Sequence, residues 1–320
     1  MSVVLVTGGA GFIGSNLVES LMQDNRVSGV RILDNLATGS LRNIQELLTD
    51  PRVLFIEGDI RDYDTCLRAC EGVNYISHQA ALGSVPRSIN DPLTSNNVNI
   101  TGTLNVFTAA KEKGVKRIVY AASSSTYGDH PGLPKVEDRI GRPLSPYAVT
   151  KYVNELYAQV YGSLYGMELI GLRYFNIFGP RQNPQGPYAA VIPLFVKALL
   201  QSQPPVINGD GTHSRDFTFV ANAVQANIAA MFTTNAEAVN QVYNIACGEQ
   251  TSLTELYTIL QKEAGSTVAP VYGKERTGDV KHSLADISKA GEKLDYQPLV
   301  SVREGLHTTF DWYKNNPDRL

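Results

Sequence analysis

The sequence predicts an α/β fold, with a doubly wound parallel sheet covered by helices on both faces and a smaller α/β lobe built from the C-terminal part of the chain. Short apolar runs of the kind found in fully buried strands alternate with segments of helical period. This alternation is typical of a parallel sheet with crossover helices. The runs lie at residues 3–6, 30–33, 53–56, 73–76, 117–121 and 169–172.

The pattern changes from about residue 180 onward. Prolines interrupt it at positions 180, 184, 187 and 193, and Gly209-Asp210-Gly211 marks a turn. We therefore expect a first lobe over residues 1–179, to which a strand returns from near residues 217–246, and a second, discontinuous lobe over residues 180–320. With 320 residues and 43% hydrophobic content, the chain is long enough to bury a core in both lobes.

A glycine-rich segment, Thr7-Gly8-Gly9-Ala10-Gly11-Phe12-Ile13-Gly14, follows the first apolar run and precedes a helical pattern. Gly8 permits the tight turn, Gly11 lets the backbone approach a pyrophosphate, and Gly14 lets the helix pack closely on the strand. The free N–H groups at the start of the helix then face the anion. In this strand-to-helix context the segment predicts a Rossmann-type dinucleotide site.

Asp34 ends the second apolar run, 20 residues after Gly14, where a carboxylate accepts hydrogen bonds from an adenosine ribose. Because this carboxylate repels a 2′-phosphate, the predicted cofactor is NAD rather than NADP, although Arg31 and Arg42 are nearby in the sequence. Asp59 and the segment His78-Gln79-Ala80-Ala81 follow the third and fourth runs. They therefore lie at the carboxyl ends of strands, where such sheets bind ligands.

The segment Tyr147-Ala148-Val149-Thr150-Lys151 places a phenol and an ammonium one helical turn apart. The charge of Lys151, and that of an oxidised nicotinamide ring, would lower the pKa of Tyr147 from about 10 and make it a base. A surface pair on a helix has the same spacing. The preceding dinucleotide segment and the run Ser123-Ser124-Ser125 favour an enzyme that moves a hydride and a proton to and from a sugar or alcohol carbon.

Charge and cysteine content exclude several classes of protein. The net charge of -3, without runs of like charge, argues against nucleic acid or an anionic membrane as a partner. No apolar stretch approaches the roughly 20 residues of a membrane span, so we expect a cytoplasmic protein. Of the three cysteines, Cys66, Cys70 and Cys247, at least one cannot pair within the chain. Cys66 and Cys70 are interpreted as two reduced thiols on a helix rather than a metal or redox pair, and no metal site is expected. The remaining histidines show no ligand spacing: His130, His213, His282 and His307.

These motifs, together with Arg173-Tyr174-Phe175-Asn176, Ser214-Arg215-Asp216 and Arg276-x-x-Asp279, resemble the extended short-chain dehydrogenase/reductases, specifically the nucleotide-sugar 4-epimerases. The resemblance covers nearly the whole chain. Segments 78–88 and 123–129 make it most similar to bacterial UDP-N-acetylglucosamine 4-epimerases. It implies NAD bound in the first lobe, a UDP-sugar gripped by the second, and a homodimer.

The resemblance also implies a set of site residues. Catalysis is expected from Tyr147, Lys151 and one of Ser124 and Ser125, between which the sequence does not choose. Cofactor contacts are expected from Gly8, Gly11, Phe12, Ile13, Gly14, Asp34, Asn35, Gly39, Asp59, Ile60, Gln79, Ala80, Ala81, Asn99, Ser123, Tyr147, Lys151 and Tyr174. Substrate contacts are expected from Ser84, Ser124, Ser125, Asn176, Ala190, Val191, Arg215, Arg276, Asp279 and Ser283.

The implied reaction is the C4 epimerisation of UDP-GlcNAc to and from UDP-GalNAc through a 4-keto intermediate. Ser283, four positions after Asp279, stands where some bacterial galactose-type epimerases carry a Tyr that closes the wall near the sugar C2. A serine leaves room there for an acetamido group. Gly83, where galactose-type enzymes carry Lys, points to the same subfamily.

Other functions on the same fold remain open. The chain could epimerise UDP-Glc/UDP-Gal or UDP-uronic acids, or act as another NAD-dependent nucleotide-sugar dehydratase, decarboxylase or reductase. Dehydratases need an acid and base pair at Thr-Asp-Glu positions, where this chain has Ser-Ser-Ser-Thr and no carboxylate until Asp129. A non-catalytic NAD-sensing scaffold is a further alternative, against which the intact Tyr147 and Lys151 argue.

Overall fold

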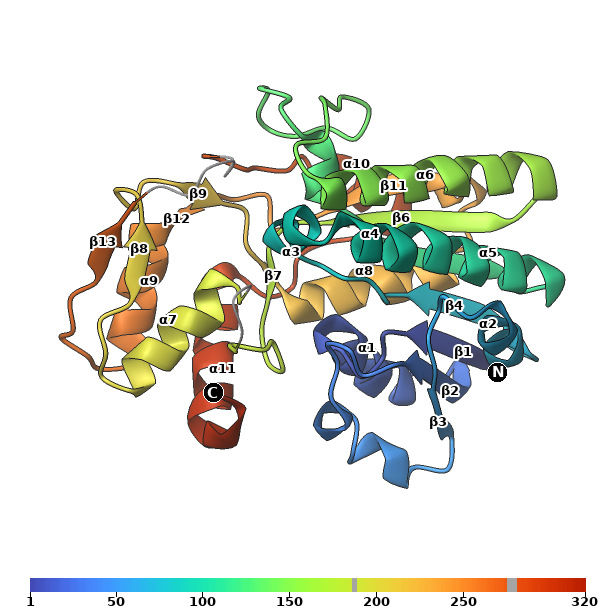
Figure 1. Cartoon of the computed structure of the whole chain (residues 1–320), viewed down its shortest axis with the longest axis horizontal. Helices are drawn as coiled ribbons and strands as arrows, with labels where there is room; N and C mark the ends of the chain where they lie inside the picture. The colour runs from blue at the N-terminus through green and yellow to red at the C-terminus, as the bar shows by residue number, and fades with distance from the viewer. Residues whose placement is uncertain (186–188, 275–280) are drawn as a thin grey trace.

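The large lobe is built on one seven-stranded sheet, in which every strand runs parallel to its neighbours (Figure 1). The structure is a computed structural model that describes residues 1–185, 189–274 and 281–320. The strand order is β11-β6-β5-β4-β1-β2-β3, so the order reverses at β1. The strands are β1 (Ser2–Thr7), β2 (Val27–Asp34), β3 (Val53–Glu57), β4 (Tyr75–His78), β5 (Arg117–Ser123), β6 (Glu168–Tyr174) and β11 (Gln241–Ile245).

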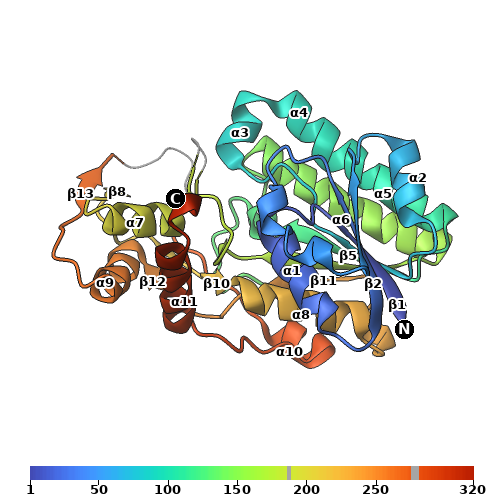
Figure 2. The same cartoon turned by 90° about the horizontal axis from the view of Figure 1, so that it is seen from below.

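Helices cover both faces of this sheet (Figure 2). One face carries α1 (Phe12–Met22), α8 (Val220–Phe232) and α10 (Ser288–Leu294). The other carries α2 (Tyr63–Cys70), α5 (Thr103–Glu112) and α6 (Pro146–Tyr165). Two short helices and a π-helical segment lead into α5: α3 (Val85–Asn90), α4 (Pro92–Asn96) and η3 (Asn97–Gly102). The doubly wound α/β fold predicted from the sequence is therefore confirmed.

Within its described residues, the small lobe packs helices beside short strand pairs (Figure 1). Its helices are α7 (Val191–Leu200), α9 (Leu253–Glu263) and α11 (Val302–Asn315). The strands pair as β7 (Ile177–Phe178) with β10 (Thr218–Phe219), β9 (Ser214–Arg215) with β12 (Thr251–Ser252), and β8 (Val206–Asn208) with β13 (Val271–Gly273). Single 3-10 turns complete the chain: η1 (Leu41–Asn43), η2 (Leu47–Thr49), η4 (Ser124–Tyr127), η5 (Ala236–Ala238) and η6 (Pro317–Arg319).

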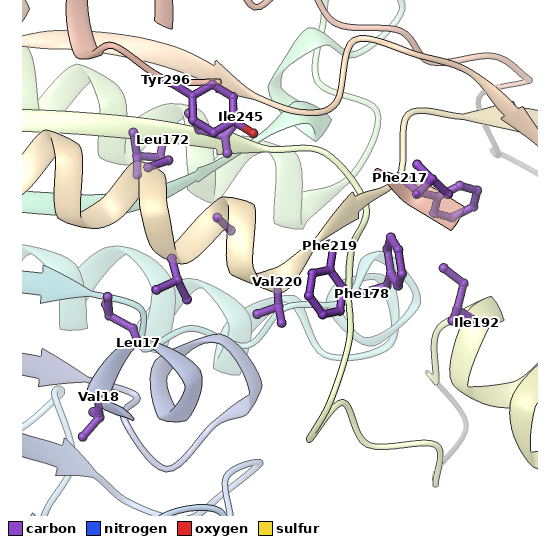
Figure 3. Close-up of a cluster of buried hydrophobic side chains, with 14 of the residues drawn as sticks. Leu17, Val18, Leu172, Phe178, Ile192, Phe217, Phe219, Val220, Ile245 and Tyr296 are labelled. Atoms are coloured by element: carbon purple, nitrogen blue, oxygen red, sulfur yellow. The ribbon is translucent and has the colours of Figure 1, made fainter. Parts of the chain in front are cut away.

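The two lobes share one apolar core (Figure 3). Leu17 of α1 and Leu172 of β6 belong to the same buried cluster as Phe219, Phe178 and Ile192, which lie toward the small lobe. A second buried cluster fills the space between the sheet and α2, α5 and α6. Because burial of contiguous apolar surface is the main favourable term in folding, the shared core fixes the two lobes against each other.

The chain crosses between the lobes several times. β7, which belongs to the small lobe, precedes the boundary expected at residue 179, and the chain returns to the large lobe for α8 and β11. α10 is a further return, since it packs on β11 and α8. Within the described residues, no helix is long and apolar enough to cross a membrane.

All six apolar runs form strands, and one is displaced. The run at residues 73–76 was predicted as a strand, but β4 begins at Tyr75. Val73 instead closes the turn after α2, where its N–H donates to the carbonyl of Cys70. His78 is consequently the last residue of β4 rather than the first residue after it.

Candidate functional site

A cavity of about 620 Å³ opens at the carboxyl edge of the sheet, where the strand order reverses. This is the place at which open parallel sheets bind ligands. The glycine-rich segment and the ends of β2 and β3 line one part of the cavity. The ends of β5 and β6 and the first turns of α6 line another part, which includes Tyr147 and Lys151.

The glycine-rich segment has the close contacts that its sequence predicts. Gly8 has a φ of 69°, and a Cβ at this position would lie 2.7 Å from the nitrogen of Ala80. A Cβ on Gly14 would overlap the carbonyl oxygen of Gly8. α1 begins after Gly11 without a side-chain cap, so no side chain competes for the N–H groups of its first turn. These features fit the pyrophosphate of a dinucleotide.

The end of β2 fits an adenosine ribose without a 2′-phosphate. Asp34 accepts hydrogen bonds from the nitrogens of Ala10 and Leu36, at 3.0 and 2.8 Å, and burial raises the pKa of its carboxyl. The guanidinium of Arg31 is engaged elsewhere, because Nη1 donates to the carbonyls of Ala69 and Glu71 at the end of α2. It is thus held away from any phosphate beside Asp34.

Asp59 is held rigidly after β3. Its carboxylate accepts two bonds from the side chain of Arg61 and one, at 2.8 Å, from the amide of Asn35. The bond from Arg61 is the main cause that lowers the pKa of Asp59 to about 2. The carboxylate is therefore ionised and oriented at neutral pH.

Tyr147 and Lys151 both project from the start of α6 into the cavity. The hydroxyl of Ser145 caps the helix by accepting from the nitrogen of Ala148 at 3.1 Å. The Nζ of Lys151 donates to the carbonyl of Ala121 at 2.8 Å and lies 5.9 Å from the centre of the Tyr147 ring. Burial lowers the pKa of Lys151 to about 8.

The pKa of Tyr147 differs from the sequence-based expectation. Burial raises it, and a hydrogen bond with the side chain of Ser123 opposes that rise. Lys151, which was expected to lower it, is turned toward the backbone carbonyl of Ala121. Among the groups of the protein, burial and Ser123 therefore determine the pKa of Tyr147.

The three serines of the run, from which Ser124 or Ser125 is expected to be catalytic, have different surroundings. Ser123 ends β5, lines the cavity and contacts Tyr147. Ser124 lines the cavity as well. Ser125 lies behind them, because η4 turns it back so that its hydroxyl and its nitrogen both donate to the hydroxyl of Ser123, at 2.9 and 3.2 Å.

This cavity is lined by all of the residues that are expected to contact the cofactor, except Gly39 and Asn99. Gly39 packs behind the glycine-rich segment, where a Cβ would lie 2.9 Å from the carbonyl carbon of Ala10. Asn99 is buried in the π-helical segment η3. Its side chain accepts from the nitrogen of Leu82 at 2.8 Å and donates to Thr150 at 3.1 Å. Both residues therefore support the wall from behind.

His78 is a buried structural histidine beneath the site. Its Nδ1 and Nε2 lie 2.7 and 2.9 Å from the hydroxyls of Thr7 and Thr103. Burial, with a smaller effect of the Lys151 charge, lowers the pKa of His78 to about 3. The hydroxyl of Thr103 donates to the carbonyl of Asn99, so Nε2 carries the proton and Nδ1 accepts from Thr7.

A second cavity of about 600 Å³ lies against the small lobe and shares three lining residues with the first, namely Asn176, Ile177 and Gln182. Ala190, Val191 and Arg215 line it, as expected for substrate contacts. Ser84, Ser124 and Asn176 line the first cavity. The predicted contacts Arg276 and Asp279 lie outside the described residues.

Ser283 lines neither of these cavities within the described chain. Its hydroxyl accepts from the nitrogen of Asp216 at 3.3 Å and from the amide of Asn176 at 3.5 Å. Ser283 therefore lies behind Asn176. Its expected effect on sugar selectivity would be transmitted by Asn176, or would arise only when a larger side chain replaces the serine.

Sequence reasoning missed several polar residues that hold the site together. Asp216 is fully buried and accepts hydrogen bonds from the nitrogens of Cys247, Gly248 and Ala285. In the sequence, Asp216 is marked only by its place beside Arg215 in the segment Ser214-Arg215-Asp216. Asn227 on α8 gave no signal beyond a polar residue within an apolar helical pattern. In the described chain, no group of three or more His, Cys, Asp or Glu side chains could hold a metal ion.

A glycine-rich segment, a ribose-binding carboxylate and a Tyr and Lys pair at the reversal point of a parallel sheet define a nicotinamide-dinucleotide enzyme. The profile of the NAD dependent epimerase/dehydratase family matches residues 4–246, and the chain belongs to this family. Its cofactor is NAD.

Known relatives match over nearly the full chain. A UDP-glucose 4-epimerase of Mycolicibacterium smegmatis is 37% identical, with 97% of this chain and 98% of the relative covered. A UDP-N-acetylglucosamine 4-epimerase from Methanobrevibacter ruminantium, solved with UDP-N-acetylmuramic acid, is 39% identical with a TM-score of 0.93, covering 98% and 99% of the two chains. A UDP-glucuronic acid 4-epimerase from Bacillus cereus, solved with UDP-glucuronic acid and NAD, is 32% identical with a TM-score of 0.91, again covering 98% and 99%.

Proposed function

We propose that this protein is a UDP-sugar 4-epimerase that interconverts UDP-GlcNAc and UDP-GalNAc through a 4-keto intermediate. The observation that carries the proposal is the junction of the two cavities. One holds the dinucleotide segment and Tyr147, the other holds Arg215, and Asn176 and Gln182 line both. An elongated ligand with a sugar at one end and a nucleotide at the other fits such a pair of cavities. The planar guanidinium of Arg215, which lines the second cavity, is the kind of group that binds a diphosphate.

Tyr147 is proposed as the catalytic acid and base. NAD, when bound, supplies a hydride acceptor for the sugar C4 and later a hydride donor. Tyr147 takes the proton of the 4-hydroxyl and returns it to the 4-oxygen after the sugar has presented its other face. Lys151 is proposed to stabilise the phenolate that forms by the proximity of its charge, since its Nζ lies 5.9 Å from the centre of the Tyr147 ring while it donates to the carbonyl of Ala121.

Ser123 joins Tyr147 in this proposal in place of Ser125. Its hydroxyl contacts the phenol and accepts from Ser125, so a chain of hydroxyls leads away from Tyr147. Ser124, which also lines the cavity, is proposed to hold the sugar. This assignment replaces the choice between Ser124 and Ser125 that the sequence left open.

The inversion step requires that the 4-keto sugar turn within the cavity. Gly83 lines this cavity, and a Cβ added there would meet no atom within 4 Å. Free volume beside the site favours both the rotation and an acetamido group at C2. The N-acetylated pair is therefore proposed as the substrate, in keeping with the likeness to the M. ruminantium enzyme.

Related activities are distinguished by one further feature. In the described chain, the carboxylates that line the first cavity are Asp34 and Asp59, both at the ends of β2 and β3 rather than beside Tyr147. A dehydratase needs a carboxylate near the sugar for the loss of water, so this arrangement favours epimerisation. UDP-Glc/UDP-Gal is the second candidate pair, because the M. smegmatis relative carries that name.

The experiment is an incubation of the purified protein, without added cofactor, with UDP-GlcNAc, UDP-Glc or UDP-GlcA in separate reactions. Chromatographic separation of the C4 isomers should show UDP-GalNAc formed fastest. Faster formation of UDP-Gal or UDP-GalA would assign the other sugar, and a 4-keto-6-deoxy product would indicate a dehydratase. Denaturation of the same preparation should release NAD and not NADP.

A further inference from the structure

Asn227 is the centre of a buried hydrogen-bond network beneath the cofactor cavity. It lies on α8, on the face of the sheet opposite α6, and is 0% exposed. Its Oδ1 accepts from the hydroxyl of Ser77 and from the amide of Gln79, each at 3.0 Å. Its Nδ2 donates at 2.7 Å to the hydroxyl of Tyr174 and at 2.7 Å to the carbonyl of Ala223. Every polar group of the side chain is thus used.

Three of the four partners of Asn227 also bond to one another. The hydroxyl of Tyr174 donates to Oε1 of Gln79 at 3.2 Å, and the amide of Gln79 also donates to Ser77 at 2.9 Å. The side chain of Gln79 is therefore fully engaged within the protein. Gln79 therefore lines the cavity in a position that these hydrogen bonds fix.

These contacts connect strands that are not neighbours. Gln79 follows β4 and Tyr174 ends β6, whereas β5 lies between them in the sheet. Both residues line the cofactor cavity. The backbone of Gln79 and Ala80 also lies against Gly8, where a Cβ would be 3.0 Å from the carbonyl carbon of Gln79. A shift of Gln79 would therefore move the wall against which the glycine-rich turn is packed.

We infer that Asn227 is a positioning residue for NAD, which holds Gln79 and Tyr174 in the wall of the cofactor cavity. It touches neither cavity itself, so it acts only through these two side chains. The alternative is that Asn227 merely stabilises α8, as any satisfied buried amide does. The two roles differ in their effect on NAD affinity.

Asn222 provides a matched control on the same helix. It is also fully buried, and it exchanges two hydrogen bonds with the backbone of Val300, at 2.7 and 3.0 Å. Neither Asn222 nor Val300 lines the cofactor cavity. Asn222→Ala and Asn227→Ala therefore remove the same group from the same helix, with comparable expected losses of stability.

The test measures NAD affinity and thermal unfolding for both variants after removal of bound nucleotide. We expect Asn227→Ala to raise the Kd for NAD by about tenfold, because two cavity-lining side chains lose a shared partner. Its Kd for UDP should stay unchanged. Asn222→Ala should lower the unfolding temperature to a similar extent and leave the Kd for NAD as in the parent. Neither readout depends on which sugar the enzyme uses.

A second variant keeps the inference testable if Asn227→Ala does not fold. Tyr174→Phe removes the hydroxyl that joins Asn227 to Gln79 and changes the volume little. We expect its Kd for NAD to rise several-fold, in the same direction. An equal loss of NAD affinity in the variants of Asn222 and Asn227 would overturn the inference, as would unchanged affinity in Tyr174→Phe.

Discussion

At the scale of single residues, the proposed chemistry depends on one hydroxyl. Tyr147→Phe deletes the group that would carry the proton and leaves the ring that fills the first turn of α6. We expect the turnover rate to fall by about 10² to 10⁴, the usual contribution of a general acid or base. Bound NAD and the unfolding temperature should remain as in the parent. Unchanged turnover would exclude Tyr147 as the base.

Ser283 offers a test of sugar selectivity. Ser283→Tyr adds bulk behind Asn176, and we expect it to lower turnover of the N-acetylated pair while sparing UDP-Glc and UDP-Gal, if those are used. Ser283→Ala is the matched variant, since it removes the bonds from Asp216 and Asn176 without adding bulk. Paired kinetics on both sugar classes decide the question. Equal losses in both classes would mean that Ser283 only holds Asn176 in place.

The catalytic residues show what a sequence motif can and cannot provide. Tyr147 and Lys151 could be placed together because a helix fixes the geometry of residues four apart. The partner serine could not be assigned, because it depends on the 3-10 turn η4, which brings Ser125 back onto Ser123. The direction of the Lys151 ammonium depends on the carbonyl of Ala121, which is 30 residues away in the chain.

At the scale of elements, His78 connects β1, β4 and the start of α5 through two threonine hydroxyls. Its pKa is about 3 in the fold and about 6.5 in an unfolded chain. Between these values the unfolded state binds a proton that the folded state does not. The free energy of unfolding should therefore fall as the pH drops below 6.5. His78 contributes up to about 1.4 kcal/mol of this loss per pH unit.

Urea unfolding between pH 4 and 7 would measure this dependence. We expect His78→Gln, which keeps one donor and one acceptor, to show a shallower loss of stability toward acid than the parent. His307→Gln is the control, because the pKa of this exposed histidine is raised by Glu263 and its loss cannot flatten the acid side. Identical slopes in His78→Gln and the parent would contradict the role given to His78.

The packing of α1 on the glycine-rich segment makes a second prediction at this scale. A Cβ on Gly14 would overlap Gly8 and lie 2.8 Å from the Cα of Gly9, so Gly14→Ala must push α1 away from the turn. We expect this variant to lose bound NAD and to unfold at a lower temperature. Gly291→Ala, in α10, meets its nearest atom at 3.6 Å and should be neutral or stabilising. Nucleotide released on denaturation provides the measurement, and retained NAD in Gly14→Ala would refute the prediction.

The elements differ in how far the sequence predicts them. Six of the seven strands of the sheet coincide with apolar runs, which leave a clear pattern in the sequence. The strands of the small lobe have two or three residues each, too few for any period to appear. α10 returns to the large lobe because its apolar side packs on β11, a tertiary contact without a local signal.

At the scale of the whole molecule, polar contacts between the lobes supplement the shared core. The amide of Asn16 in α1 donates to the carbonyl of Pro180 at 3.2 Å, and Arg181 pairs with Glu19 at 2.8 Å. Near the C-terminus, Arg319 donates to the side chain of Asn43 at 3.1 Å, and Asn43 donates to the carbonyl of Ala10. The substrate side is thereby tied to the glycine-rich segment, and the two cavities meet in a fixed geometry.

The exposed face of α6 and the adjacent α3 and α4 bears on the proposed homodimer. Val149, Leu156, Val160 and Leu164 form a stripe along α6, with spacings of seven, four and four residues. Leu164 is 69% exposed, and on the adjacent short helices Ile89 and Leu93 are 60% and 77% exposed. A group of exposed apolar side chains on helices that contact one another marks a surface that binds another protein. We propose a second copy of this chain as the partner, because antiparallel pairing of such a stripe about a two-fold axis is self-complementary.

Light scattering coupled to size-exclusion chromatography should therefore give about twice the chain mass of 34.9 kDa for the parent. We expect the double variant Leu156→Glu with Val160→Glu to elute as a monomer, since charges facing each other across the axis would repel. Leu299→Glu is the control, because Leu299 is 72% exposed but lies outside these helices, and it should leave the mass unchanged. A monomeric parent, or dissociation in the Leu299 variant alone, would show that α6 does not form the interface.

Because α6 also carries Tyr147 and Lys151, loss of the dimer should loosen the first turns of the helix and reduce turnover in the double variant.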